Sequence, residues 1–336
     1  MRRVITVWLM LIFTATVWQP PATATESEEA NTVTQREQLF RHMEALSGIP
    51  WYFLAAVDQY ERNVRNARND LPDADAEDLI AIRIPTEKWS GPLNPDPTDT
   101  NPVSIRLFNG MGQDGNGDGR ADANDAEDAL VAVVRYLQGY GSDWTSLRIG
   151  VWHLYQHPVA VDVISHIAKI YATLNTMDLD EHHFPVSLHH NYTYRSTWGA
   201  KRGWGGRRIH EGTDIFAGHG VPVYSTSYGF VEVKGWNKFG GWRVGIRDVH
   251  NNYHYYAHLG RFHEDLHTGM IVKPGDLLGY VGNSGYGPPG TAGKFPPHLH
   301  YGMYKFNGHT QWSFDPYPYL RKWERETRKR AQEQHS

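Results

Sequence analysis

The chain has 336 residues, of which 40% are hydrophobic, and this length predicts two folded units rather than one small domain. Its formal net charge of -4 lacks the basic excess that nucleic-acid binding requires, so nucleic acid is not an expected partner. The absence of cysteine excludes disulfides, thiolate zinc ligands and lipid attachment through an N-terminal cysteine.

Residues 1–24 have the pattern of a secretory signal peptide. Two arginines precede an apolar run over residues 4–17, and the small-x-small site Ala22-Thr23-Ala24 follows. The run is shorter than the about 20 apolar residues of a membrane span. We therefore expect cleavage and export to the cell wall, periplasm or medium, without stable membrane insertion. An uncleaved membrane anchor is the alternative.

An α-helical domain is predicted for residues 35–176, after a flexible polar lead-in over residues 25–34. Apolar residues recur there at three- and four-residue intervals, which indicates helices. The helical stretches are 35–67, 125–138 and 159–174, and Gly48-Ile49-Pro50 divides the first of them in two. Residues 85–103 are rich in proline and aspartate and predict an irregular loop.

The segment from Ile49 to Glu61 resembles the first catalytic segment of the lysozyme-like lytic transglycosylases, whose acid would be Glu61. Cleavage of a glycosidic bond uses a carboxylic acid kept protonated by apolar surroundings. Residues 110–113 (Gly-Met-Gly-Gln) resemble an abbreviated second segment of that family. Three interpretations remain open: an active glycosidase, a degenerate relative that binds the cell wall, and a helical domain with a structural glutamate.

The acidic segment 114–125 matches the calcium loop of an EF-hand. Oxygen side chains occupy positions 1, 3, 5, 9 and 12, position 6 is glycine, and position 7 offers its carbonyl. The last position is aspartate where glutamate is usual. We expect a structural Ca²⁺ here, and the alternative is a tight turn rich in glycine and aspartate. The predicted ligands are Asp114, Asn116, Asp118, Arg120, Asp122 and Asp125.

Residues 177–193 lack a steady period and are predicted to form a solvated linker, with metal binding by its histidines as the alternative. Residues 194–318 alternate apolar and polar positions between frequent turns, which predicts an antiparallel β domain. Its expected strands are 221–224, 230–235, 242–248, 253–258, 277–281 and 299–304. Residues 319–336 predict a charged, solvated helical tail.

Two segments of the β domain predict a metal site. His298 and His300 are two residues apart, so a strand turns both to one face, and an extended segment does the same for His210 and Asp214. Imidazole and carboxylate are normal zinc ligands, and a catalytic zinc keeps three of them with one position open for water. Glu211 is an expected bystander, because the helical zinc motif needs histidine at position 214.

In order and spacing, His210-x-x-x-Asp214, then Tyr256-Ala257-His258-Leu259, then His298-x-His300 resemble the signature of the lysostaphin-type zinc endopeptidases, which cut peptides in bacterial cell walls. The resemblance covers residues 195 to 315. It implies that His210, Asp214 and His300 hold Zn²⁺. It also implies that His258 and His298 are catalytic histidines without a bond to the metal.

These histidines have two tasks to share. One removes a proton from water, and the other steadies the tetrahedral intermediate and protonates the leaving amine. The sequence leaves open which histidine does which, and residues 285–297 form a longer loop than is usual in the family. The sequence thus predicts a secreted zinc endopeptidase that cuts the stem or cross-bridge of peptidoglycan. The alternatives are a non-catalytic protein that binds the wall or regulates another hydrolase, and a peptidoglycan glycosidase acting through Glu61.

Overall fold

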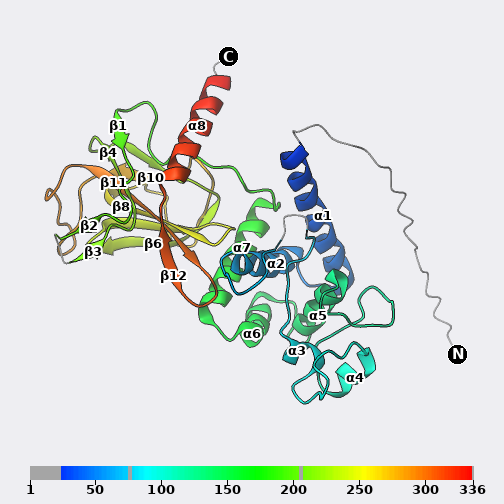
Figure 1. Cartoon of the computed structure of the whole chain (residues 1–336). Coiled ribbons are helices and arrows are strands. Elements are labelled where there is room, and N and C mark those ends of the chain that lie inside the picture. The colour runs from blue at the N-terminus through cyan, green and yellow to red at the C-terminus, as the bar shows by residue number, and fades with distance from the viewer. Residues whose placement is uncertain (1–23, 75–77, 204–206, 335–336) are drawn as a thin grey trace.

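The computed structural model describes residues 24–74, 78–203 and 207–334, so the predicted signal peptide lies outside it except for Ala24. The described chain forms a helical N-terminal domain followed by an antiparallel β domain, which confirms the predicted fold class (Figure 1). No helix within the described ranges combines the length and the apolar character needed to cross a bilayer. The helices of the first domain are α1 (Ala24–Ser47), α2 (Trp51–Arg65), α3 (Thr86–Ser90), α4 (Pro102–Leu107), α5 (Ala126–Gln138), α6 (Trp144–Tyr155) and α7 (Pro158–Leu174).

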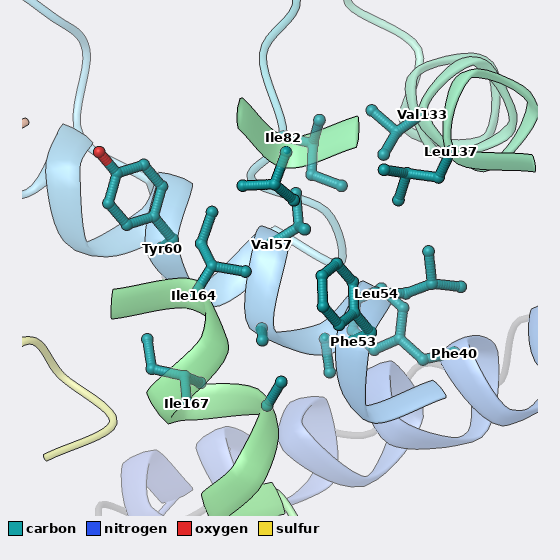
Figure 2. Close-up of a cluster of buried hydrophobic side chains, with 14 of the residues drawn as sticks. Phe40, Phe53, Leu54, Val57, Tyr60, Ile82, Val133, Leu137, Ile164 and Ile167 are labelled. Atoms are coloured by element: carbon teal, nitrogen blue, oxygen red, sulfur yellow. The ribbon is translucent and has the colours of Figure 1, made fainter. Parts of the chain in front are cut away.

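Helix α2 forms the centre of the helical domain. Phe53 and Val57 are one turn apart, so they lie on the same face, and both are fully buried. They pack in one cluster with Leu137 of α5 and Ile164 of α7 (Figure 2). The predicted break after α1 is present, because Gly48 adopts a left-handed conformation with φ of 75° and ends that helix.

The start of α1 corrects one prediction. The helix begins at Ala24 and runs through residues 25–34, where the sequence predicted a flexible lead-in. Helix α6 was not predicted, because its large apolar residues do not all face the core. Ile149 and Trp152 are among the exposed hydrophobic residues of the domain, so the helical period is weak there.

The β domain contains one large antiparallel sheet, whose long path runs β1-β4-β11-β8-β7-β6-β9, and a separate two-stranded sheet of β2 and β3. Strand β11 is paired on both sides, with β4 and with β8. In this register His300 lies opposite Asp214 on one neighbour and opposite Ala257 on the other, which brings all three sequence motifs together. The strands are β1 (Tyr192–Tyr194), β2 (Lys201–Arg202), β3 (Arg208–Ile209), β4 (Thr213–Ala217), β5 (Pro222–Tyr224), β6 (Gly229–Asn237), β7 (Gly241–Arg247), β8 (Asn252–Phe262), β9 (Ile271–Val272), β10 (Leu277–Val281), β11 (His298–Phe306) and β12 (Gln311–Phe314).

Neither the predicted linker nor the predicted tail is simply solvated. In the linker, Phe184 is fully buried and its backbone N–H donates to the Oγ1 atom of Thr327. That threonine belongs to α8 (Tyr317–Glu333), which buries Leu320 and Trp323 in the core of the β domain. Both segments therefore form part of this domain.

The two domains pack directly on one another. The imidazole of His166 on α7 stacks on the ring of Phe230 on β6, with 4.0 Å between centroids. Its Nδ1 lies 2.9 Å from a carboxylate oxygen of Glu232. The side-chain amide of Asn63 donates to the carbonyl of Val249 at 2.9 Å. Because the interface combines apolar and polar contacts, the helical domain is held in a defined position relative to the sheet.

Candidate active site

Three predicted ligands converge at the end of the central strands. His210 follows β3, Asp214 lies on β4 and His300 on β11. The Nε2 atom of His210 lies 2.9 Å from Nδ1 of His300 and 3.1 Å from Oδ1 of Asp214. Nδ1 of His300 lies 2.9 Å from the same carboxylate oxygen. Among the described residues, this is the only group of three or more histidine, cysteine or acidic side chains with ligand atoms so close together.

The chemistry of this group fits a divalent cation such as zinc. The Nδ1 atom of His210 lies 3.0 Å from the carbonyl of Thr197, and a carbonyl only accepts, so Nδ1 carries the proton and Nε2 presents a lone pair. Burial opposes ionisation of Asp214, but the neighbouring imidazoles of His210 and His300 outweigh it and hold the pKa of that carboxyl well below its usual range. Two imidazole nitrogens and a carboxylate oxygen thus face one point, as zinc requires.

The two predicted catalytic histidines lie beside the ligands, with ring centroids 4.9 Å apart. The Nδ1 atom of His258 is 2.7 Å from the carbonyl of Ser284, and that of His298 is 2.9 Å from the carbonyl of Pro296. Each Nδ1 therefore donates, and each Nε2 is left as a proton acceptor. Nε2 of His298 is buried without a hydrogen-bond partner in the described structure, 3.7 Å from Oδ1 of Asp214.

His258 has an unusual backbone conformation. Its φ is 62°, the left-handed region that residues other than glycine seldom occupy, and such strain is concentrated at functional sites. The pairing of β8 changes register near this position with both of its neighbours here, β7 and β10. Burial, with the nearby imidazoles of His300 and His298, lowers the pKa of His258 to about 3. The ring is accordingly neutral at neutral pH.

Two arginines at this site were missed from the sequence. The guanidinium of Arg202 on β2 donates to Oδ2 of Asp214, opposite the oxygen that faces the histidines. That of Arg208 on β3 donates to the hydroxyl of Tyr286, whose ring stacks on His258 with 6.1 Å between centroids. Both arginines line the groove of about 120 Å³ that contains His210, His258 and His300. The available signal was the basic residues on both sides of the glycine-rich sequence 203–206.

Glu211 also lines this groove but stays outside the ligand group. It accepts a hydrogen bond of 3.4 Å from the hydroxyl of Tyr304 on β11. Its predicted role as a bystander of the metal agrees with this contact.

Glu61 lies in a second cleft, of about 440 Å³, between the helical domain and the β11–β12 turn at Gly308 and His309. The hydroxyl of Tyr155 donates to its Oε1 atom at 2.6 Å. Burial raises the pKa of Glu61 to about 7, because it disfavours the charged form. Residues 110–113 do not line this cleft, so the structure does not bring the two transglycosylase-like segments together there.

In the predicted calcium loop, the carboxylates accept hydrogen bonds from nearby backbone N–H groups. Asp114 accepts from Gly117 and Gly119, and Asp125 caps the start of α5. Asp128, which the sequence motif did not include, accepts from the N–H groups of residues 115, 116 and 122 and fixes the loop on the helix. The carboxylates of the loop do not form a group of the kind seen at His210 within the described residues.

The groove lies on an antiparallel sheet and contains a set of zinc ligands beside two neutral histidines. This arrangement is that of a metal-dependent hydrolase. Residues 208–316 match the model of peptidase family M23. A relative in Bacillus subtilis strain 168, an L-Ala--D-Glu endopeptidase, is 54% identical over 325 residues, which span 97% of this chain and 98% of the relative. The chain therefore belongs to peptidase family M23. This membership confirms the predicted class, a zinc metalloendopeptidase that hydrolyses peptidoglycan.

Similarity to lysostaphin of Staphylococcus simulans is confined to a smaller region. The two sequences are 32% identical over 117 residues, which cover 34% of this chain and 22% of lysostaphin. A solved structure of lysostaphin aligns with a TM-score of 0.33 at 28% identity, over 43% of this chain and 55% of that one.

Proposed function

We propose that this protein cleaves the bond between L-alanine and D-glutamate in peptidoglycan stem peptides. The Bacillus relative supports this bond, because its similarity extends through the helical domain as well as the peptidase domain. The evidence for peptide hydrolysis itself is that the ligand atoms of His210, Asp214 and His300 converge beside two neutral histidines.

The role of each active-site residue follows from its position. His210, Asp214 and His300 hold the zinc, which when bound lowers the pKa of water and polarises the scissile carbonyl. His298 accepts the proton of the attacking water at Nε2, because that atom is buried, unpaired among the described residues and next to Asp214. The Nε2 atom of His258 carries no proton in the neutral ring, so it first takes up the proton that the neighbouring His298 removed from the water and then passes it to the leaving amine. Arg202 holds the outer oxygen of Asp214 and so orients the carboxylate.

Mass spectrometry of digested cell wall tests the bond. Purified protein is incubated with wall sacculi, and the soluble fragments are sequenced by fragmentation. We expect new fragments that begin with glutamate and glycan-linked remnants that end in alanine, and neither should form with a His258→Ala variant. New ends at glycine, or at the cross-links between stems, would contradict the proposed bond while leaving the peptidase class intact.

The cleft of Glu61 favours a second role for the helical domain. We propose that it holds the glycan strand, with the protonated Glu61 carboxyl donating a hydrogen bond to a sugar oxygen. Glu61 is the only acidic side chain among the described residues that line the cleft, whereas the usual glycoside hydrolases use a pair of carboxyl groups. This composition supports binding over cleavage.

The test uses the His258→Ala variant, so that peptide cleavage does not release the wall. Co-sedimentation with insoluble wall should weaken when Glu61→Gln is added to it. Equal sedimentation of the two proteins would contradict glycan binding at Glu61. New reducing or anhydro sugar ends that depend on Glu61 would instead establish a glycosidase.

We also propose export with removal of residues 1–24, since the peptidoglycan substrate lies outside the cytoplasm. The basic start, short apolar run and Ala22-Thr23-Ala24 support cleavage at that point. N-terminal sequencing of protein recovered from the cell exterior should begin at Thr25. An intact Met1 in that fraction would support the uncleaved anchor instead.

For segment 114–125 we propose a structural Ca²⁺. The order of oxygen side chains supports it, and the carboxylates that now accept backbone N–H groups would turn part of their lone pairs to the ion. The binding would stiffen the connection between α4 and α5 without taking part in catalysis.

A further inference from the structure

The cleft of Glu61 adjoins a second hollow of the helical domain. The cleft has a volume of about 440 Å³, and the second hollow, of about 350 Å³, extends toward residues 121–124. Both are lined by Arg83, Ile84 and Thr86. The two hollows therefore form one groove, and Arg83 lies where they join.

Positive charge outnumbers negative charge in the Glu61 cleft. Three arginines line it, Arg65, Arg68 and Arg83, whereas Glu61 is the one acidic side chain among the described residues there. Burial raises the pKa of Glu61 to about 7, so this carboxyl carries only part of its negative charge near neutral pH. The cleft therefore suits a ligand that bears a negative charge.

Arg83 is the arginine best placed to meet such a ligand. The guanidinium of Arg65 donates to two backbone carbonyls of the loop after α2, and that of Arg68 is held by Asp70. The side chain of Arg83 is exposed, and no group of the described chain forms a hydrogen bond or ion pair with it. Its charge faces the groove without serving a contact inside the described protein.

Strand β11 separates this groove from the zinc ligands. The ring of Phe306, the last residue of the strand, lies 5.5 Å from that of His157 in the lining of the cleft. His300 is six positions earlier, which is ~20 Å at about 3.3 Å per residue. Only one alanine lies between the sugar and the proposed scissile bond, and an extended residue spans at most about 3.6 Å. A sugar in the cleft is therefore not the one whose stem is being cut.

The proposed reaction leaves a new negative charge on the glycan. Hydrolysis of the bond between L-alanine and D-glutamate converts the alanine carbonyl into a carboxylate. The alanine stays attached to its sugar through its amine, so this carboxylate remains on the strand after the rest of the stem has left. Before the cut, the same position is a neutral amide.

We propose that Arg83 pairs with this alanine carboxylate, so that the groove binds glycan from which stems have already been removed. A guanidinium suits the task because its N–H groups match the two oxygens of a carboxylate. Each cut then creates a docking point that keeps the peptidase near the remaining stems. The inference rests on the proposed scissile bond and on the proposed binding of glycan at Glu61.

The test measures the binding of two soluble glycan fragments that differ only at this group. One carries a single alanine with a free carboxylate on each stem-bearing sugar, and the other carries alaninamide. The protein is the full-length His258→Ala variant. It should bind the carboxylate glycan about three- to tenfold more tightly, the usual effect of a partly exposed, charged hydrogen bond. Adding Arg83→Gln should remove this preference and leave the affinity for the amide glycan within about twofold.

Arg135→Gln is the matched control, because Arg135 is also an exposed arginine of the helical domain but lines neither hollow. It should keep the preference. Arg83→Lys, which retains the charge, should keep part of it and so separates a lost charge from a folding defect. Equal affinity for the two glycans before Arg83 is changed, an unchanged preference in Arg83→Gln, or equal losses on both glycans would overturn the role of Arg83.

This result is independent of the bond that the protein cuts, because both glycans are supplied ready-made. The mass spectrometry of digested wall decides the bond separately. New ends elsewhere in the stem would remove the source of the alanine carboxylate and overturn the proposed specificity, whereas a failed preference with correct ends would overturn only the binding at Arg83.

Discussion

Asp214 in the β domain is buried and Glu61 in the helical domain is half-buried in its cleft, yet the structure keeps the two carboxyl groups in opposite states of charge. Asp214 accepts from an arginine and lies against two imidazoles, and its pKa lies well below the usual range. Glu61 accepts from one neutral hydroxyl, and its pKa rises to about 7. Burial alone would raise the pKa of both carboxyl groups, so the neighbouring residues determine whether each carboxyl group is charged. The charged Asp214 carboxylate suits a cation, and the protonated Glu61 carboxyl can donate a hydrogen bond.

The largest expected effect concerns the peptidase groove. Changing His258 to alanine should lower kcat by about 100- to 10,000-fold, because a group that transfers protons is lost, while the three ligands remain. The release of free amines from cell wall measures the activity, and the zinc content of the protein shows whether the ligands still hold the metal. His267→Ala, at an exposed histidine of the same domain, should match the wild type. Loss of zinc along with activity would show that His258 belongs with the ligands.

That groove also shows how far the sequence could predict the site. Even spacing within His210-x-x-x-Asp214 and His298-x-His300 placed each pair on one face, and the strand order of β11 between β4 and β8 supplied the rest. The positive φ of His258 could not be predicted, because it arises from the shifts in pairing around β8. Arg202 and Arg208 were missed because short, irregular strands give no register.

In the fold, helices and strands with a regular hydrophobic period could be predicted from the sequence. The burial of side chains by distant parts of the chain could not. The break between α1 and α2 follows from the chemistry of glycine and proline at residues 48–50. The role of α8 depends on Leu320 and Trp323, two apolar side chains in a highly charged helix, and only the sheet beneath them explains their burial. Asp128 likewise lies three residues beyond the calcium motif, and only the folded loop shows its contacts.

A smaller effect is expected from Glu61→Gln on the pH dependence of stability. The pKa of Glu61 in the folded protein is above the ordinary value of 4.5, so its contribution to stability is complete below about pH 4.5, declines toward about pH 7 and is lost above that. Glu61→Gln stays neutral, and at about pH 8 it should be more stable than the wild type by about 1–3 kcal/mol. At about pH 4 the two should agree. Denaturant unfolding at both values measures this, and a difference independent of pH would contradict the raised pKa.

Exposed Glu264 supplies the matched control for that comparison. The Glu264→Gln variant should follow the pH dependence of the wild type, because its side chain faces solvent. A stabilisation at high pH in this variant as well would point to a general effect of net charge rather than to the cleft.

The smallest expected effect is that of calcium on the helical domain. With a dissociation constant of about 1 mM, about 5 mM Ca²⁺ should stabilise the protein by about 1 kcal/mol. Thermal unfolding with and without a chelator measures the change. The stabilisation should disappear in Asp118→Ala, whose carboxylate accepts from the N–H of Arg120 at the outer part of the loop. Equal calcium responses in the two proteins would contradict binding at residues 114–125.

One ion, held by two imidazoles and one carboxylate, makes this groove a peptidase. Zinc stoichiometry measured together with amine release, for the wild type and for Asp214→Ala, tests it most directly. The wild type should hold one zinc per active chain, and the variant should lose both zinc and activity. A metal-free preparation with full activity, or a variant that retains both properties, would contradict it.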